Sequence, residues 1–328
     1  MLRVVPYNQI DRKAWSRLVQ QSSTGTWFQT PEAYDFLSTQ PKLFAPFVVA
    51  IMDERFGMRG VCVGYVTNEQ NGLKHYFTRR AIIMGGPCLA EDATNKEAES
   101  LMNTIRNQVN SKAIYIETRN FNDYTRWKAA FEAAGFAYKP HLNFHVDPVQ
   151  IQWSDNRKRQ IKKSDAICEL AITEYEIREW YEVLQNLYRT KVKTPLWPVE
   201  FFLEAYRQGV GKFLLVKHEG KVIGGSMVVK DDRCVYEWFE CGMNAAYKDQ
   251  YPSVMATWAG IQYAKKQGCT RYDMMGAGEP GVPYGVRDFK SEFGGTLVEH
   301  GRFLCVCRPG LYRIGSIAVK WLKGRAKK

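Results

Sequence analysis

Residues 213–230 read Phe-Leu-Leu-Val-Lys-His-Glu-Gly-Lys-Val-Ile-Gly-Gly-Ser-Met-Val-Val-Lys. Two apolar runs flank the dipeptide Glu219-Gly220, and this pattern predicts a β-hairpin. A third strand, then a helix capped by Ser253 and stopped by Gly268, and then a further strand should follow. The expected strands are 213–218, 221–230, 233–241 and 271–275, and the expected helix is 253–267.

The two halves of the chain follow one plan. In each half, a pair of helices precedes antiparallel strands, a further helix and then more strands, which is an α+β arrangement. The order around residues 213–275 is that of the central unit of the N-acyltransferase (GNAT-like) fold. We therefore expect two tandem GNAT-like lobes, each a mixed, mostly antiparallel sheet flanked by helices. The first half should contain helices near 11–22, 30–38, 95–110 and 124–134, and strands at 47–52, 61–67, 80–84, 113–118 and 142–146; the second half adds helices from 174 to about 189 and over 198–208, and a strand over 296–307.

A change of composition near residue 150 marks the expected domain boundary. The sequence Asp147-Pro148 closes the first lobe, and residues 156–163 then contain five basic side chains and no acidic one. We expect a first lobe over 1–150, a second lobe over 151–310 and a basic tail over 311–328.

Composition restricts the function classes. The chain has 328 residues and a net charge of +12, of which +9 falls on residues 151–328, and this asymmetry favours an anionic partner. No apolar stretch reaches the length of a membrane span, and no signal peptide is recognisable near the first residue. The eight cysteines are scattered without a Cys-x-x-Cys pair, which predicts reduced thiols in a cytoplasmic protein, no disulfide framework and no metal site.

The segment 284–295, Tyr-Gly-Val-Arg-Asp-Phe-Lys-Ser-Glu-Phe-Gly-Gly, contains the strongest chemical signal. It places Lys290 between Phe289 and Phe293. A lysine held against aromatic rings near a strand end presents a fixed positive charge to a reacting group. A loop with a solvent-exposed lysine is the alternative if this segment is taken alone.

Several motifs together resemble the Fem family, whose members are two-lobed, GNAT-like peptidyltransferases that add amino acids to the peptide stem of bacterial cell-wall precursors. The most specific is the C-terminal signature, Phe289-Lys290-x-x-Phe293-Gly294-Gly295, preceded by Tyr272-Asp273-Met274-Met275-Gly276. Weaker matches are Thr26-Trp27-Phe28-Gln29-Thr30, Met84-Gly85-Gly86-Pro87, Gly135-Phe136 before a strand, and the basic run 157–166.

The resemblance implies an aminoacyl or peptidyl transfer. An amine of the peptide stem would attack the ester of an aminoacyl-tRNA, and an amide would form through a tetrahedral oxyanion. Lys290 matches the family lysine that stabilises this oxyanion, and Phe289 is its neighbour. The amine must lose a proton, and the candidate bases are Asp288, Glu292, Asp273 and Glu240, which the sequence does not rank. Asp273 and Phe293 are also candidates for substrate contact.

Three basic segments are candidates for phosphate contact. By resemblance, Arg189, Lys191 and Lys193 would bind the diphosphate of the precursor; a solvated helix end is the alternative. In the run 157–163, Arg157, Lys158, Arg159, Lys162 and Lys163 would bind the tRNA backbone, unless they form a solvated linker helix. The tail 311–328 has the pattern of a basic amphipathic helix, suited to peripheral contact with the anionic inner face of the membrane or to docking on the second lobe.

Two other hypotheses remain open. The first is an acyl-CoA-dependent N-acyltransferase acting on an envelope sugar or lipid, although the loop 247–253 lacks the glycines that bind the CoA pyrophosphate and contains Pro252. The second is a catalytically silent module that binds nucleic acid or membrane. The Gly-x-Gly-x-x-Gly motif at 276–281 does not indicate a dinucleotide site, because Pro280 and Pro283 prevent a helix from beginning there.

Overall fold

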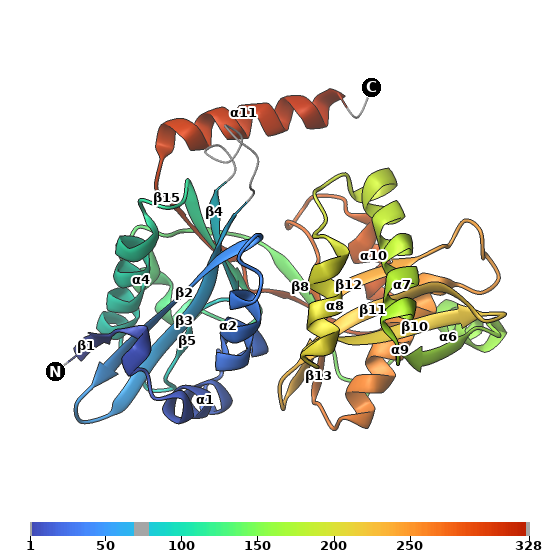
Figure 1. The fold of residues 1–328 in the computed structure, drawn as a ribbon, viewed down its shortest axis with the longest axis horizontal. Helices are drawn as coiled ribbons and strands as arrows, with labels where there is room; N and C mark the ends of the chain where they lie inside the picture. The colour runs from blue at the N-terminus through green and yellow to red at the C-terminus, as the bar shows by residue number, and fades with distance from the viewer. Residues whose placement is uncertain (1, 69–78, 326–328) are drawn as a thin grey trace. The chain divides into compact units, whose positions relative to one another are not determined.

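A computed structural model describes residues 2–68 and 79–325 of the chain, with side chains described as far as Ile317. The chain forms two compact units: Met1–Pro140 together with His300–Lys328, and His141–Glu299 (Figure 1). Each unit is built on one mixed β-sheet flanked by helices. The expected α+β class with two lobes is therefore confirmed.

The first unit contains a sheet with the strand order β1-β2-β3-β4-β6-β15-β7, with β5 paired to β3. All pairs are antiparallel except β4 with β6. Its helices are η1 (Tyr7–Gln9), α1 (Arg12–Gln21), η2 (Trp27–Gln29), α2 (Pro31–Ser38), α4 (Asn95–Val109), η3 (Thr125–Trp127), α5 (Lys128–Ala133) and α11 (Pro309–Arg325). Its strands are β1 (Leu2–Val5), β2 (Phe44–Asp53), β3 (Gly57–Thr67), β4 (Arg80–Gly85), β5 (Cys88–Leu89), β6 (Tyr115–Asn120), β7 (Ala137–Lys139) and β15 (Arg302–Val306).

The second unit contains a sheet with the order β14-β8-β13-β12-β11-β10-β9, in which only β12 and β13 are parallel. Its strands are β8 (Leu142–Val146), β9 (Ile167–Leu170), β10 (Lys212–His218), β11 (Lys221–Lys230), β12 (Cys234–Gly242), β13 (Arg271–Gly276) and β14 (Thr296–Glu299). Its helices are α6 (Asp155–Lys163), α7 (Glu174–Leu187), the π-helical turn η4 (Tyr188–Val192), α8 (Val199–Arg207), α9 (Pro252–Lys266) and α10 (Gly285–Ser291).

Two strands, β8 and β15, do not lie in the sheets that a domain boundary at residue 150 predicts. Strand β8, expected to close the first lobe, pairs with β13 and β14 of the second sheet. The expected strand 296–307 is interrupted at Gly301, whose φ is +64°, and its second part, β15, lies between β6 and β7 of the first sheet. The alternating pattern of a strand shows which of its faces is buried but not which sheet it joins.

Local capping signals explain most helix boundaries. Thr94 with Glu97 and Thr173 with Glu176 form complete capping boxes at the starts of α4 and α7. Helix α9 differs from the expectation, because its N-cap is Tyr251 and Pro252 occupies the first turn, so Ser253 is already inside the helix. The expected helix 124–134 is a 3₁₀ turn followed by the short helix α5.

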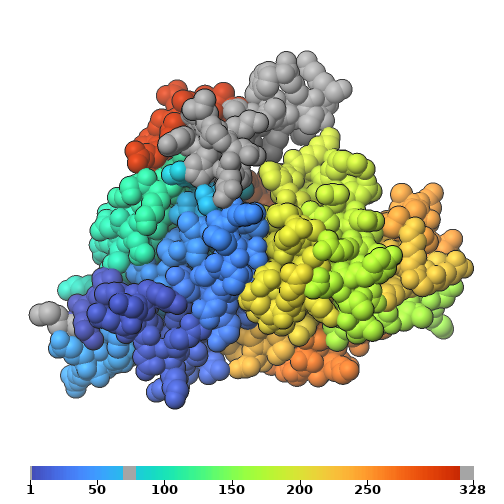
Figure 2. All heavy atoms as spheres, in the orientation of Figure 1, coloured from blue at the N-terminus to red at the C-terminus, as the bar shows by residue number. Residues whose placement is uncertain are grey.

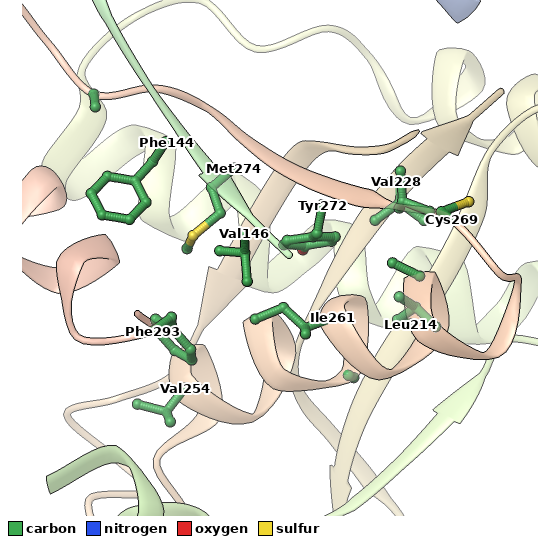
Figure 3. Close-up of a cluster of buried hydrophobic side chains, with 14 of the residues drawn as sticks. Phe144, Val146, Leu214, Val228, Val254, Ile261, Cys269, Tyr272, Met274 and Phe293 are labelled. Atoms are coloured by element: carbon green, nitrogen blue, oxygen red, sulfur yellow. The ribbon is translucent and has the colours of Figure 1, made fainter. Parts of the chain in front are cut away.

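Large aromatic side chains fill both interiors. The second unit buries Trp180, Phe202 and Phe213 between its sheet and the helices α7 and α8, which cover one face (lime to yellow in Figure 2). On the other face, Tyr272, Met274 and Phe293 point with Val254 and Ile261 of α9 into one apolar cluster (Figure 3). This cluster fixes the segment 289–293 against the end of β13.

Helix α11 follows β15, and its first turn packs on the first sheet. The rings of Tyr312 and Tyr115 lie 5.6 Å apart, edge to face. Ile314 and Ile317, by contrast, are exposed. Among the described residues, no helix has the length and apolarity needed to cross a bilayer.

Candidate active site

A β-bulge in β12 brings two glutamates to the same face of the second sheet. In the pairing with β11, Glu240 lies opposite Ser226 and Glu237 lies opposite Val228, which leaves Trp238 as the extra residue. Because Ser226 and Val228 are two residues apart and face the same side, their partners do too. Without the bulge, Glu237 and Glu240 would point to opposite faces.

Glu237 is buried, and one of its carboxylate oxygens accepts two hydrogen bonds. Its Oε1 atom accepts hydrogen bonds from Tyr272 Oη at 2.7 Å and from Thr257 Oγ1 at 3.1 Å. Burial raises the pKa of Glu237, and the nearby Lys290 charge and the two hydroxyl groups oppose this rise only in part.

Glu240 is less enclosed than Glu237. The residue is half-buried, and its Oε1 atom is buried without a hydrogen-bond partner among the described residues. Burial and the neighbouring Glu237 raise the pKa of Glu240 to about 8, while Ser253 and Lys290 act in the opposite direction. A carboxyl group with a pKa near neutrality that retains contact with solvent can accept and return a proton at physiological pH.

Lys290 lies at the end of helix α10, and its side chain is buried. Its Nζ atom donates to the carbonyl oxygen of Met274 and, at 2.7 Å, to that of Gly276. Met275, between these two residues, has a φ of +59°. Of the three N–H donors of an ammonium group, one therefore has no acceptor among the described residues. Burial lowers the pKa of Lys290, and Glu237, Asp273 and Glu240 oppose that change.

The expected contact of Lys290 with two aromatic rings is wrong. Phe289 and Phe293 instead hold Arg157, whose Cζ lies 4.5 Å and 5.0 Å from their ring centroids. Successive helix residues point about 100° apart, which separates Lys290 from Phe289, and the Lys290 ammonium is bonded instead to the carbonyls of Met274 and Gly276. Arg157 is 5% exposed, which also argues against the expected contact of its guanidinium with a tRNA phosphate.

Arg287, one helical turn before Lys290, organises the Gly-x-Gly-x-x-Gly segment. Its guanidinium donates to the carbonyl oxygens of Ala277 at 3.4 Å, Glu279 at 3.0 Å, and Val282. No helix begins within residues 276–281, as the prolines predicted. Arg287 and Lys290 together therefore hold five backbone carbonyls between Met274 and Val282.

The other candidate bases differ from Glu240 in their surroundings. Asp288 is exposed in the first turn of α10. Glu292 accepts hydrogen bonds from Ser154 and Asn156 and so attaches α6 to α10. Asp273 is fully buried and pairs with His145 at 3.1 Å; burial alone would raise its pKa, but His145 and other partners bring it below the usual value.

The remaining basic candidates are exposed. Arg189, Lys191 and Lys193 occupy η4 and the residue after it, and Lys193 has a φ of +55°. On α6, Lys158 pairs with Asp155 at 3.1 Å, and Lys163 pairs with Asp249 at 2.6 Å. Arg159 donates to Asn156, and Lys162 is exposed.

Sequence reasoning missed Glu237, Thr257, Tyr272 and Arg287. Strand periodicity assigns Glu237 and Glu240 to opposite faces of the sheet, and no residue type in β12 indicates the bulge. The only available signal for Arg287 was its position three residues before Lys290, which places the two side chains on one face of a helix. Within the described residues, no group of three or more potential metal ligands occurs.

The helix starts of both units fit a CoA pyrophosphate poorly. At α9, Pro252 has no N–H, and the N–H of Ser253 donates to Asn244 Oδ1 at 3.1 Å. At α4, the Glu97 carboxylate closes the capping box and pairs with Arg59 at 2.6 Å. Backbone donors at a helix start are what binds such a phosphate, and here Pro252 lacks one and the N–H groups of Ser253 and Glu97 already donate to side chains.

Comparison with known proteins agrees with this architecture. Residues 154–291 match the family described as "Acetyltransferase (GNAT) domain". The match lies within the second unit, and the expected fold of two GNAT-like lobes is confirmed. A search of curated proteins gives no significant match.

Among solved structures, FemX superposes with a TM-score of 0.72 at 12% identity, covering 95% of this chain and 99% of that chain. L-PGS from Bacillus licheniformis superposes with a TM-score of 0.56 at 11% identity, covering 93% and 96%. A tandem GNAT protein from the clavulanic acid biosynthesis pathway gives 0.57 at 11% identity, covering 94% and 99%. At these identities the likeness shows the fold, and the FemABX-like resemblance is confirmed at that level.

Proposed function

We propose that this protein is an aminoacyltransferase that forms an amide on the peptide stem of a peptidoglycan precursor, with an aminoacyl-tRNA as donor. The observation that carries the proposal is the arrangement of Glu240, Glu237 and Lys290 on one side of the GNAT sheet. The similarity to FemX supports the choice of substrate class.

In this mechanism, Glu240 is the general base. The neutral amine of the acceptor attacks the ester carbonyl carbon, and a C–N bond forms. The ionised Glu240 carboxylate takes the proton that the nitrogen must lose, and then returns it to the ribose oxygen as the C–O bond breaks. The pKa of about 8 suits both steps, because it is close to the working pH.

Lys290 stabilises the tetrahedral intermediate. Its ammonium is fixed by two backbone carbonyls, so its remaining N–H has a defined direction. A preorganised donor in a water-poor site is worth far more to a developing oxyanion than the same donor in water. Removal of such a donor typically lowers kcat by about 100- to 1,000-fold.

The poor fit of the α9 and α4 starts to a pyrophosphate favours a donor other than acyl-CoA. The alternative, a CoA-dependent N-acyltransferase acting on an envelope sugar or lipid, retains the support of the GNAT domain match. The same carboxyl group would serve either reaction, because both release a proton from an amine.

A direct test measures amide formation by mass spectrometry of a UDP-linked sugar peptide, with either aminoacyl-tRNA or acetyl-CoA as donor. We expect transfer from tRNA by the wild type, about a 100-fold lower kcat for Glu240→Gln, and an unchanged rate for Glu182→Gln, an exposed residue of α7. Transfer from acetyl-CoA alone would replace this proposal by the alternative. Absence of transfer from both donors would favour a catalytically silent module.

We further propose that α11 places the enzyme at the cytoplasmic face of the membrane. Ile314 and Ile317 are exposed one turn apart, and the rest of the helix contributes Lys320, Lys323 and Arg325 in sequence. Exposed apolar residues beside basic ones favour an anionic bilayer surface. A lipid-linked precursor would be met at that surface.

A further inference from the structure

A second bulge lies at the end of β13. In the antiparallel pairing with β8, Asp273 is opposite His145, and Gly276 is opposite Asn143. Three residue steps on β13 therefore match two on β8, so β13 contains one extra residue in this interval. Met275 lies there with a φ of +59°, in the left-handed region that residues other than glycine rarely adopt. Such a conformation persists only where its surroundings hold it.

The bulge brings two carbonyl groups within reach of one ammonium. Lys290 Nζ donates to the carbonyl oxygens of Met274 and Gly276, which lie on either side of Met275. In an extended strand, carbonyl groups two residues apart are separated by about 6.6 Å. Two hydrogen bonds of normal length from one nitrogen need acceptors no more than about 5.8 Å apart. A regular strand would therefore offer Lys290 only one of these bonds.

The Asp273 carboxylate connects the bulge to the neighbouring strand. Its Oδ1 atom accepts a hydrogen bond from the Met275 N–H at 2.7 Å. Its Oδ2 atom lies 3.1 Å from His145 Nε2 on β8. Burial alone would raise the pKa of Asp273, but His145, Arg271 and the Met275 N–H bring it below the usual value. One oxygen of this carboxylate therefore holds the extra residue, and the other is held by β8.

We propose that Asp273, supported by His145, is a positioning residue for the Lys290 ammonium. The carboxylate keeps Met275 in its left-handed conformation, and this brings the carbonyls of Met274 and Gly276 to the same Nζ atom. The two bonds then fix the direction of the remaining N–H of Lys290. This role differs from the base or substrate contact expected for Asp273 from the sequence. Its value for catalysis rests on the proposed function, in which that N–H meets the oxyanion.

The test measures how fast acetic anhydride labels Lys290 in the folded protein, by mass spectrometry of its peptide. An ammonium held by two carbonyls must leave them before it reacts, so labelling of the wild type should be slow. Asp273→Ala removes the support of the bulge and should be labelled about tenfold faster, which corresponds to the loss of about one hydrogen bond. His145→Ala should give a smaller rise, and His145→Gln, which keeps an N–H donor, should restore the slow rate.

The Asp273→Asn variant separates position from charge. It loses the negative charge that favours the ionised form of Lys290, but its side-chain oxygen can still accept from the Met275 N–H. We expect it to be labelled at nearly the wild-type rate. Equally fast labelling of Asp273→Asn and Asp273→Ala would assign the effect to charge alone and overturn the proposal.

Two other comparisons bear on the result. Thr94→Ala removes the N-cap of α4 in the first unit, so it should lower the melting temperature and leave the labelling of Lys290 unchanged. If this control is labelled as fast as Asp273→Ala, the effect reflects general stability and the proposal is overturned. His145→Ala keeps the buried carboxylate, so it tests the proposal even where Asp273→Ala does not fold. Labelling of His145→Ala at the wild-type rate would also overturn it.

Turnover gives a separate measurement. In the proposed transfer, Asp273→Ala should lower kcat about 100-fold and leave KM unchanged, because a catalytic group displaced by about 1 Å costs a factor of this size. An unchanged kcat would overturn the positioning role. If the wild type shows no transfer, the proposed function fails, and the labelling rates still decide whether Asp273 positions Lys290.

Discussion

Replacing Glu240 by glutamine should make the free energy of unfolding less dependent on pH. The folded protein holds this carboxyl group in surroundings that disfavour its ionised form, so its pKa rises from 4.5 to about 8. Below pH 4.5 the group is protonated in both the folded and the unfolded chain. Between these values only the folded chain retains the proton, so stability falls as pH rises and the loss is complete above about pH 8. Glutamine has no ionisable proton, so the Glu240→Gln variant does not lose this stability as the pH rises.

The size of the effect follows from the two pKa values. Each unit of difference corresponds to about 1.4 kcal/mol, so ionising Glu240 in the folded protein costs at most about 5 kcal/mol. Partial exposure of Glu240 to solvent reduces this figure to roughly 2–4 kcal/mol. About half of the change falls between pH 6 and pH 9, which gives roughly 1–2 kcal/mol in an accessible range.

The assay is urea unfolding of the wild type, Glu240→Gln and the control Glu182→Gln at about pH 6 and about pH 9. The wild type and the control should lose roughly 1–2 kcal/mol more stability over this interval than Glu240→Gln. Glu237 also has a raised pKa and is coupled to Glu240, so the comparison measures the loss of the ionisable Glu240 together with its effect on Glu237. Parallel pH dependence in all three, within about 0.5 kcal/mol, would refute the buried-carboxyl reasoning.

Three further predictions concern other parts of the chain. Lys290→Met should lower the kcat of amide formation by about 100- to 1,000-fold. It should also lower the free energy of unfolding by about 1–3 kcal/mol, because two backbone carbonyls lose their donor; wild-type turnover would remove Lys290 from the mechanism. Gly294→Ala should destabilise by about 2 kcal/mol or more in thermal denaturation, since φ is +70° and the new Cβ would lie 1.9 Å from the Gln152 carbonyl oxygen; Gly285→Ala, with open space around its Cβ position, is the control. Deletion of 311–328 should weaken sedimentation with phosphatidylglycerol vesicles and leave sedimentation with neutral vesicles unchanged. If the truncated protein and the full chain sediment equally with phosphatidylglycerol vesicles, α11 has no role in membrane binding.

Local patterns in the sequence predicted local structure well. The hairpin around Glu219-Gly220 forms β10 and β11, and the capping box at Thr173 opens α7. These features depend on a few neighbouring residues, so their physical causes lie within the same short segment. The repeated α+β plan followed from the same signals and is present in both units.

The features that define the site depend on residues distant in sequence, and the sequence did not predict them. Arg157 stacks on Phe289 and Phe293 across more than a hundred residues, although the run around it reads as a solvated basic helix. The exchange of β8 and β15 is equally non-local, because either strand pattern fits either sheet. The bulge at Trp238 depends on the pairing with β11, and it alone puts Glu237 beside Glu240.

The signature around Lys290 can now be understood as two sets of contacts on one short helix. Arg287 and Lys290, three residues apart, hold the carbonyls of the segment that follows β13. Phe289 and Phe293, four residues apart, hold Arg157 and thereby attach α6. Because α10 is only about two turns long, packing from both sides is what fixes the Lys290 ammonium near Glu237 and Glu240. A substitution in either set should therefore change how strongly Lys290 stabilises the ionised Glu240 carboxylate, although Glu240 itself is unchanged.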